Sequence, residues 1–122
     1  MEPTIFDKNM MWQDHLPTGW SGLYQQFIER LTAIDPTLRV TGAKRKFGEL
    51  CIRFDRYNRE ADALARVAEQ SSRTLCQMCS APGELRADMN SVYATLCDLH
   101  AGATRPSDRP AIYSIIVHPS DD

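Results

Sequence analysis

The sequence lacks the features that mark membrane-spanning and exported proteins. No apolar segment approaches the roughly 20 residues that a transmembrane helix needs. The amino terminus, MEPTIFDKNMMWQDH, has neither the apolar centre nor the cleavage site of a secretory signal peptide. We therefore expect a cytoplasmic protein with no membrane partner, in a compartment where cysteine thiols stay reduced.

The recognisable patterns of catalytic sites are missing as well. There is no glycine-rich phosphate loop, no serine–histidine–aspartate set and no patterned pair of carboxylates. The H-x-E element of the zinc deaminases and the proline before their C-x2-C pair are both absent. Internal repeats and low-complexity tracts are absent too. We therefore predict a protein that is not an enzyme.

Length and composition are those of one soluble globular domain, which we expect to span residues 1–122. Hydrophobic residues make up 43% of the chain and charged residues 25%. The formal net charge of −2 disfavours non-specific attraction to nucleic acid or to an anionic membrane.

Four residues in the second half of the chain have the spacing of a metal site: Cys76, Cys79, Cys97 and His100. They form a C-x2-C pair and a C-x2-H pair, separated by seventeen residues. Thiolate sulfur and imidazole nitrogen are ligands that Zn²⁺ prefers, four at a time, in a tetrahedron. A full set of four protein ligands leaves no open position for a substrate. The spacing therefore predicts a structural Zn²⁺ site. The rival reading of C-x2-C as a redox motif is disfavoured, because the segment before it has a helical pattern.

The first part of the chain predicts an arm followed by a helix–hairpin–helix unit over residues 19–73. Residues 1–18 show no periodicity, and we expect an arm that Trp12 and Leu16 attach to the body. Apolar residues at three- and four-residue steps predict a helix over residues 19–35, with Thr18 as its cap and Pro36 after its end.

A β-hairpin and a second helix are expected next. The hairpin strands begin near residues 38–40 and at residues 50–54, and the connection GAKRKFG would project its cations into solvent. The second helix would begin after Asn58, a good capping residue, and run to about Ser72.

The metal module is expected over residues 74–102. A turn at Cys76–Cys79 is followed by a hairpin made of residues 85–86 and 91–96, and then by Cys97 and His100 at the start of a short turn or helix. This order is typical of a treble-clef zinc site, and a zinc ribbon remains the alternative. After a linker over residues 105–110, a run rich in β-branched residues predicts a closing strand at residues 111–118.

The basic residues are concentrated around the expected hairpin. Between Arg39 and Arg59 there are seven basic and only two acidic residues. Five of the cations form a candidate partner-binding surface: Lys44, Arg45, Lys46, Arg53 and Arg56. The competing interpretation is a solvated hairpin tip. No aromatic residues are interleaved with the three consecutive cations, which weakens a reading as a single-strand nucleic-acid binder. Cys51 on the second strand is read as a small core residue, with a reactive thiol as the alternative.

Several motifs together resemble a known family. They are GW..LY..F...L at residues 19–31, V..AKRKFGEL at residues 40–50, TLC..C..PGELR at residues 74–86 and VYATLCDLHA at residues 92–101. This set is similar to a family of small, uncharacterised bacterial and phage-associated proteins with a zinc module. The resemblance covers residues 19–101 and implies zinc ligands at the two cysteine-containing pairs, with no activity to carry over.

Three positions depart from the family pattern. Ser80 replaces a glycine after the second cysteine, Tyr93 stands where tryptophan is usual, and Cys51 stands where the family tends to have arginine. None of these changes removes a ligand, but Ser80 requires the metal-binding turn to accommodate a side chain.

Together these patterns predict an α+β domain in which two helices pack on a small antiparallel sheet, with a treble-clef-like or zinc-ribbon-like metal site. The leading functional hypothesis is a protein-binding module of the bacterial cytoplasm, in one concrete form an immunity protein that occludes a cognate toxin or effector. The alternative is a nucleic-acid-binding accessory protein that uses the basic hairpin. A neighbouring toxin or effector gene would favour the first hypothesis. An affinity for DNA or RNA that falls steeply with salt would favour the second.

Overall fold

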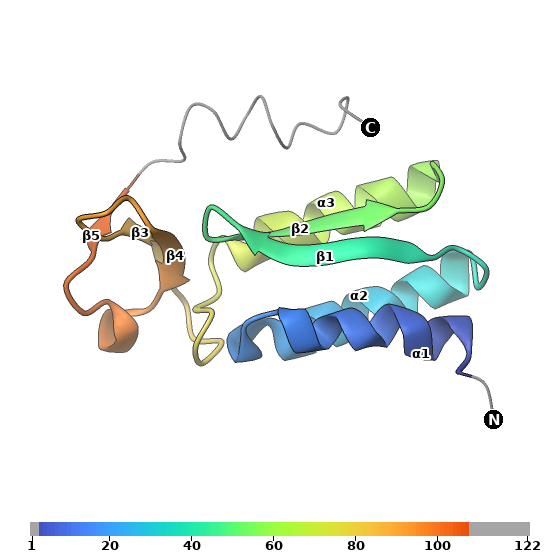
Figure 1. Cartoon of the computed structure of the whole chain (residues 1–122), viewed down its shortest axis with the longest axis horizontal. Helices are drawn as coiled ribbons and strands as arrows, with labels where there is room; N and C mark the ends of the chain where they lie inside the picture. Colours follow the sequence, from blue (N-terminus) through green and yellow to red (C-terminus); the bar gives the residue numbers. More distant parts are fainter. Residues whose placement is uncertain (1–2, 108–122) are drawn as a thin grey trace.

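A computed structural model describes residues 3–107 of the chain and confirms the predicted α+β class (Figure 1). Two small antiparallel sheets are present, one with the strand order β1-β2 and the other with the order β4-β3-β5. The α-helices are α1 (Ile5–Met10), α2 (Ser21–Ile34) and α3 (Arg59–Ser72). The strands are β1 (Val40–Lys46), β2 (Glu49–Phe54), β3 (Glu84–Ala87), β4 (Tyr93–Leu96) and β5 (Arg105–Pro106).

The main core lies between the two long helices and the β1–β2 ribbon. The apolar stripe of α2 is buried, as its spacing predicts, and α3 contributes the small residues Ala61, Ala65 and Ala68. Helix α2 ends where Asp35 becomes extended before Pro36, and the Asn58 side chain caps α3 by accepting the Ala61 N–H. The expected cap at Thr18 is wrong, because Thr18 opens a short 3₁₀ turn, Thr18–Trp20, that precedes α2.

The amino-terminal region is more regular than the sequence pattern predicts. Helix α1 begins with a reciprocal capping box between Thr4 and Asp7, and a 3₁₀ turn, Met11–His15, follows it. The expected attachment points are confirmed, since Leu16 is buried and the Trp12 indole N–H donates to the Val40 carbonyl at 3.0 Å. A helix of six residues is too short to show an apolar stripe, so its capping residues are the only local signal.

Side chains from the helices close both edges of the two-stranded ribbon. On the β1 side, Asn9 donates to the Leu38 carbonyl at 3.0 Å and accepts the Val40 N–H at 2.9 Å. On the β2 side, the Ser72 hydroxyl accepts the Leu50 N–H at 2.9 Å, and the Glu69 carboxylate accepts the Ile52 N–H at 2.8 Å. These bonds satisfy buried backbone groups that a two-stranded sheet would otherwise leave without partners.

The buried carboxylate of Glu69 gives the fold a testable pH dependence. Burial raises the pKa of Glu69 to about 7, although Arg66 and the Ile52 N–H oppose the shift. Between pH 4.5, the ordinary value, and about pH 7, the folded protein binds this proton more tightly than the unfolded chain does. The contribution of Glu69 to the free energy of unfolding therefore falls as the pH rises through this window.

Glu69→Gln should remove this dependence, because glutamine keeps an oxygen for the Ile52 N–H and does not ionise. We expect the stability of the variant relative to wild type to increase by about 1–3 kcal/mol between pH 5 and pH 8. Urea denaturation of metal-loaded protein at several pH values measures the difference. Parallel pH profiles for the two proteins would contradict the assignment.

The β1–β2 connection is tighter than the sequence suggests. The expected turn over GAKRKFG is wrong, because β1 continues to Lys46 and only Phe47 and Gly48 connect the strands. Both residues have positive φ, 51° for Phe47 and 79° for Gly48, as in the two-residue turns that match the twist of a hairpin. The three consecutive cations therefore lie on a strand and not on a flexible loop.

The carboxy-terminal module is built on the second sheet. The predicted hairpin is confirmed, with Glu84 opposite Leu96 and Ala87 opposite Tyr93. Part of the expected linker forms the short strand β5, which pairs with β3 on the side away from β4. The predicted closing strand at residues 111–118 lies outside the described residues. Within residues 3–107, no helix is long and apolar enough to cross a membrane.

Candidate metal centre

The first ligand pair sits on a tight turn that follows α3. The Ser80 N–H donates to the Cys76 carbonyl at 2.9 Å, and the Met78 N–H points at the Cys76 sulfur at 3.4 Å. Ser80 has a φ of 68°, in the left-handed region that glycine adopts most easily. The Ser80 hydroxyl compensates with a hydrogen bond to the Gly19 carbonyl.

The second ligand pair follows the end of β4. Cys97 is extended, and the 3₁₀ turn Asp98–His100 brings the histidine back beside it, with the His100 N–H donating to the Cys97 carbonyl at 3.1 Å. Between His100 and residue 107 the chain forms a turn and β5, and the α-helix of a treble clef does not occur there. Two turns facing each other beside a hairpin are closer to the zinc-ribbon alternative.

The structure brings all four predicted ligands together. Their sulfur and nitrogen atoms all lie within 4.8 Å of one another, and no other such group of histidine, cysteine or acidic side chains occurs among residues 3–107. The Cys97 sulfur lies 3.2 Å from the His100 Nδ1, and the Cys76 sulfur lies 3.6 Å from it. The Cys79 and Cys97 sulfurs are 3.7 Å apart. This cluster could hold a metal ion.

The electrostatics of the cluster favour negative charge on two of the sulfurs. Burial alone would raise the pKa of the Cys76 thiol, but the N–H groups of Cys97, Met78 and Cys79 lower it to about 6. The hydrogen bond with His100 lowers the pKa of Cys97, and the same contact raises the pKa of the imidazole.

The pKa of the Cys79 thiol is shifted in the opposite direction. The N–H of Ala81 lowers the pKa of its thiol, but desolvation and the contacts with Cys97 and Cys76 raise it above the ordinary value overall. Neighbouring sulfurs repel one another when all are charged, which opposes ionisation of the third thiol. A bound metal cation removes this conflict and allows all three to act as thiolates.

The metal-binding turn is packed against the start of α2. The Gly19 N–H donates to the Gln77 carbonyl at 2.8 Å, and the Trp20 indole N–H donates to the Leu75 carbonyl at 3.1 Å. A Cβ on Gly19 would lie 2.2 Å from the Cys76 carbonyl oxygen, so only glycine permits this approach. The Gly-Trp motif therefore connects the helical body to the ligand pair.

The β1–β2 turn also packs against the metal module. The Thr95 hydroxyl donates to the Gly48 carbonyl at 2.8 Å, and the Thr95 carbonyl accepts the Gln77 N–H at 2.9 Å. The rings of Phe47 and Tyr93 meet edge to face, with their centroids 6.0 Å apart. Figure 1 shows the start of α2 and the β1–β2 turn at the end of the body that adjoins the metal module. Sequence reasoning missed these contacts between the metal module and the helical body. The Gly-Trp motif at residues 19–20 and the Phe-Gly motif at residues 47–48 were the signals that could have indicated them.

The five cations predicted to bind a partner do not form one cluster. Cross-strand pairing places Lys44, Lys46 and Arg53 on one face of the ribbon and Arg45, opposite Leu50, on the other. Arg56 lies beyond β2 and forms an ion pair with Asp35 at 2.7 Å.

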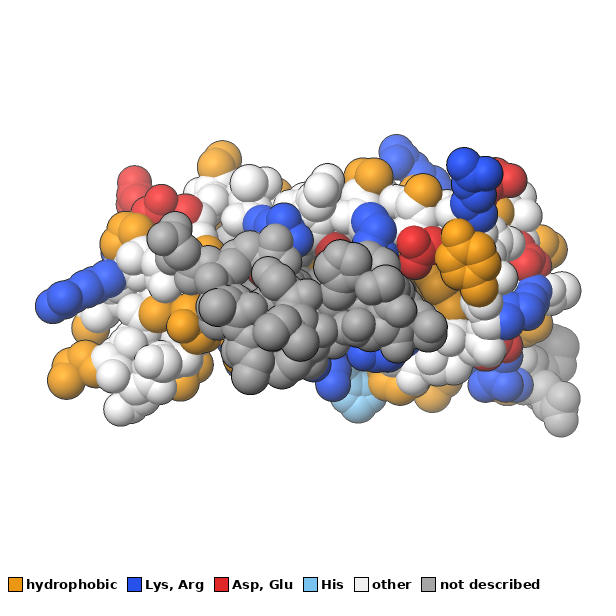
Figure 2. Space-filling model, turned by 90° about the horizontal axis from the view of Figure 1, so that it is seen from above, with side chains coloured by type: hydrophobic (Ala, Val, Ile, Leu, Met, Phe, Trp, Pro, Cys, Tyr) orange, Lys and Arg blue, Asp and Glu red, His pale blue; other side chains and the backbone are white. Residues whose placement is uncertain are grey.

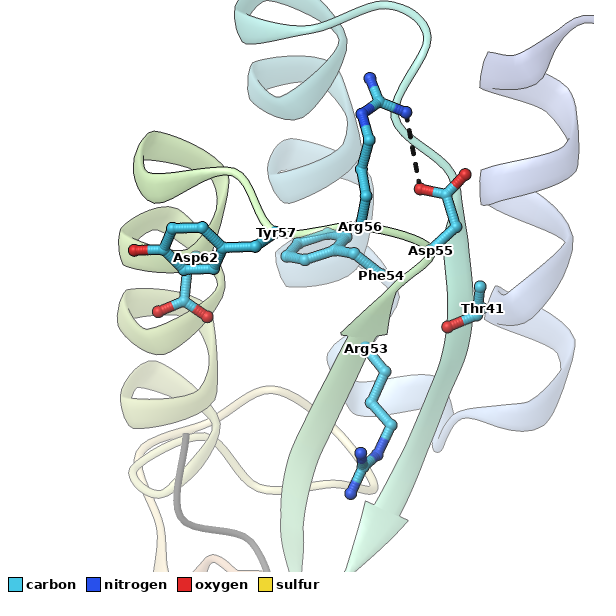
Figure 3. Close-up of a pocket in the computed structure, with 7 residues that line it drawn as sticks. All are labelled: Thr41, Arg53, Phe54, Asp55, Arg56, Tyr57 and Asp62. Atoms are coloured by element: carbon cyan, nitrogen blue, oxygen red, sulfur yellow. Dashed lines mark ion pairs between the residues drawn. The ribbon is translucent and has the colours of Figure 1, made fainter. Parts of the chain in front are cut away.

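Arg53 and Arg56 also border a surface depression of about 560 Å³ (Figure 3). Their guanidinium groups point in opposite directions there, so they do not converge on a common ligand. The residues that line the depression are Thr41, Arg53, Phe54, Asp55, Arg56, Tyr57 and Asp62.

Cys51 lies apart from the metal cluster, on β2. Its side chain is buried, and burial together with the nearby Glu69 carboxylate raises the pKa of the thiol despite the opposing effect of Arg53. A buried thiol that resists ionisation is a packing residue and a poor nucleophile.

The fold and the ligand cluster together define a small α+β protein with a candidate metal centre. Comparisons with protein-family models, with curated proteins and with solved structures found no match. The family resemblance therefore stays a prediction that rests on the sequence motifs.

Proposed function

We propose that Cys76, Cys79, Cys97 and His100 bind one structural Zn²⁺. A tetrahedral zinc ion with bonds of about 2.0–2.3 Å separates its ligand atoms by about 3.3–3.8 Å. The His100 Nδ1 lies 3.2 Å from the Cys97 sulfur and 3.6 Å from the Cys76 sulfur, and the Cys79 and Cys97 sulfurs are 3.7 Å apart, all close to this range. Four protein ligands complete the coordination shell, so the ion would brace the module and would not carry out chemistry on a substrate.

We further propose that the protein is a non-enzymatic module that binds another protein through the surface beside the zinc. The supporting observation is an exposed pair of apolar side chains, Met78 and Leu99, which we call the knuckle patch. Met78 is 55% exposed and Leu99 is 90% exposed. Each lies between the two ligands of one pair, so the candidate ion fixes both loops that present them.

Two further apolar side chains are exposed in the loop between β3 and β4, Met89 at 96% and Val92 at 53%. Figure 2 shows apolar side chains at the end of the molecule that the metal module forms, on the left in this view. Exposed apolar patches mark protein interaction sites, and four exposed apolar side chains on one small module support such a site here.

The partner of this module would be a bacterial protein, in the most concrete form a toxin or secreted effector that the module occludes. Small size, mild acidity and the lack of a catalytic pattern in the sequence support an inhibitor or immunity role. Charged side chains on the ribbon would steer encounter, and the knuckle patch would supply apolar contact. A toxin or effector gene beside this one supports the proposal, and the absence of such a neighbour weakens it.

Substitutions in the knuckle patch test the protein-binding proposal. Leu99→Asp should abolish capture of the partner from the native host, because a charge would be buried in the interface. Val67→Asp is the matched control, since Val67 is also exposed, at 56%, but lies on α3. Capture with an untagged competitor and identification by mass spectrometry measure binding, and metal content confirms that each variant keeps its site. Equal capture by the two variants would contradict the proposal.

Nucleic-acid binding is the second candidate, supported by the shared face of Lys44, Lys46 and Arg53. It predicts an affinity for DNA or RNA that falls steeply between about 50 and 200 mM salt, in proportion to the number of phosphates contacted. The net charge of −2 and the engagement of Arg56 with Asp35 place it second.

A further inference from the structure

We propose that Cys79 and Cys97 are a peroxide-reactive pair whose oxidation to a disulfide releases the metal. The inference rests on the zinc site proposed above and does not depend on which partner the protein binds. Zinc titration of the reduced protein tests the site separately from its oxidation. It rests on the unequal accessibility of the three candidate thiolate ligands and on the distance between two of their sulfurs.

Accessibility distinguishes Cys79 from the other cysteines. Cys76 is fully buried and Cys97 is only 8% exposed, whereas Cys79 is exposed at the surface of the metal-binding turn. Cys51, on β2, is buried as well. A small oxidant such as a peroxide therefore meets the Cys79 sulfur first.

Geometry selects Cys97 as the second member of the pair. Its sulfur lies 3.7 Å from the Cys79 sulfur, and a disulfide bond of about 2.05 Å needs the two to approach by less than 2 Å. The two residues lie on separate turns, one after α3 and one after β4, so small movements of these turns can close the gap. Cys76 is held in place by the Met78 N–H and by its burial, which disfavours it as the resolving residue.

The chemistry balances with one peroxide for each disulfide. With a bound cation favouring its ionised form, the Cys79 thiolate attacks one peroxide oxygen and the O–O bond breaks. After protonation the products are a sulfenic acid and one water, or one alcohol from an organic peroxide. The Cys97 thiolate then attacks the sulfenic sulfur, and the hydroxyl leaves as water after taking up a second proton. Two sulfurs are oxidised by two electrons in total, and the peroxide is reduced.

Oxidation would also reach the helical body. With two of its four ligands in a disulfide, the metal retains only Cys76 and His100 and dissociates. The turn that carries Cys76 is the one that accepts the Gly19 and Trp20 N–H groups. Protection of these two amide and indole groups against hydrogen exchange should therefore fall after oxidation.

Peroxide treatment of the full-length, zinc-loaded protein tests the proposal. Hydrogen peroxide is added in the absence of air, released zinc is measured with a chromogenic chelator, and disulfides are mapped by mass spectrometry of unreduced peptides. We expect one zinc released per Cys79–Cys97 disulfide, and recovery of zinc binding after a thiol reductant and zinc are added. Cys51→Ser, which leaves the cluster intact, should give the same release as wild type.

Three outcomes would overturn the proposal. The first is zinc that stays bound while the thiols remain reduced at peroxide concentrations that oxidise free cysteine. The second is a disulfide that joins Cys76 to either other cysteine as the main product. The third is irreversible oxidation to sulfinic acid without any disulfide.

Discussion

Gly19→Ala is expected to destabilise the protein by about 3 kcal/mol or more and to weaken metal binding. The added Cβ would lie 2.2 Å from the Cys76 carbonyl oxygen and 2.5 Å from the Gln77 carbonyl carbon. Both atoms belong to the backbone of the metal-binding turn, so no side-chain rotation can relieve the overlap. The turn must move away from α2 and give up the hydrogen bond between the Gly19 N–H and the Gln77 carbonyl.

Gly22→Ala is the matched control for this substitution. Gly22 lies three residues further along, in the first turn of α2, and a Cβ there would meet nothing within 4 Å. Since alanine is a better helix former than glycine, this variant should gain up to about 1 kcal/mol of stability. Chemical denaturation and zinc titration of both variants measure the effects. Similar stabilities for the two would show that the metal-binding turn does not pack against α2 as described.

Cys97→Ser is expected to destabilise the metal module by a different route, through the loss of zinc binding. Serine cannot supply a thiolate, so the variant should lose most of the roughly 10–16 kcal/mol of apparent binding energy that structural zinc sites provide. The module over residues 74–107 buries few large apolar side chains, with Leu96 and two candidate ligands, Cys76 and Cys97, forming its small core. We therefore expect this module to lose its fixed structure while α2, α3 and the ribbon remain folded.

Zinc titration, thermal denaturation and hydrogen exchange test these expectations for Cys97→Ser, because they measure its zinc affinity, its stability and its local structure. Protection of amides in β3 and β4 should be lost, and protection in α2 should persist beyond its first turn. Cys51→Ser is the control, because it removes a buried cysteine that is not a ligand. A Cys97→Ser protein that melts like wild type and keeps its metal would show that the ligand assignment is wrong.

Both predictions concern the same physical feature. The metal module keeps its structure only while it contacts the helical body and holds its metal ion. The module touches the body through the backbone of its first turn and through the hydroxyl of Thr95. Gly19→Ala disturbs the contact between the module and the body from the side of the body. Cys97→Ser disturbs it from the side of the metal site. Each substitution should therefore raise the free-zinc concentration at which half of the protein is loaded, and the two effects should not be additive.

Those parts of the fold that carry a periodic pattern could be predicted from the sequence. The apolar stripe of α2, the Asn58 cap of α3 and the β3–β4 hairpin are all confirmed, with bounds displaced by a few residues. The four candidate metal ligands were also predictable, because two closely spaced pairs constrain one site almost independently of the rest of the fold.

Features that depend on tertiary contacts could not be predicted in the same way. Helix α1 has only six residues, and the region is held by contacts of Asn9 in the helix and Trp12 just after it with Val40 in β1, far away in the sequence. The long loop expected at GAKRKFG fails because Phe47 accepts a positive φ that its side chain disfavours locally. Its ring packs on Tyr93 in the metal module, a contact that no local pattern reveals.

The predicted partner surface shows a further limit of sequence reasoning. Five cations close together in the sequence suggested one basic patch, but strand alternation separates Arg45 from Lys44 and Lys46. Arg56 instead forms an ion pair with Asp35, from the loop after α2. The exposed knuckle patch was not predicted at all, because an apolar residue between two ligands has no periodic signal of its own.

The most direct test of the central claim is the native mass of the untagged protein purified from its own host. We expect a folded chain that carries one zinc ion, and a chelator should remove the ion together with the protection of the module against hydrogen exchange. Any additional mass would be the bound partner and could be identified directly. A folded protein with a metal-free mass, and with unchanged stability after treatment with a chelator, would contradict the account.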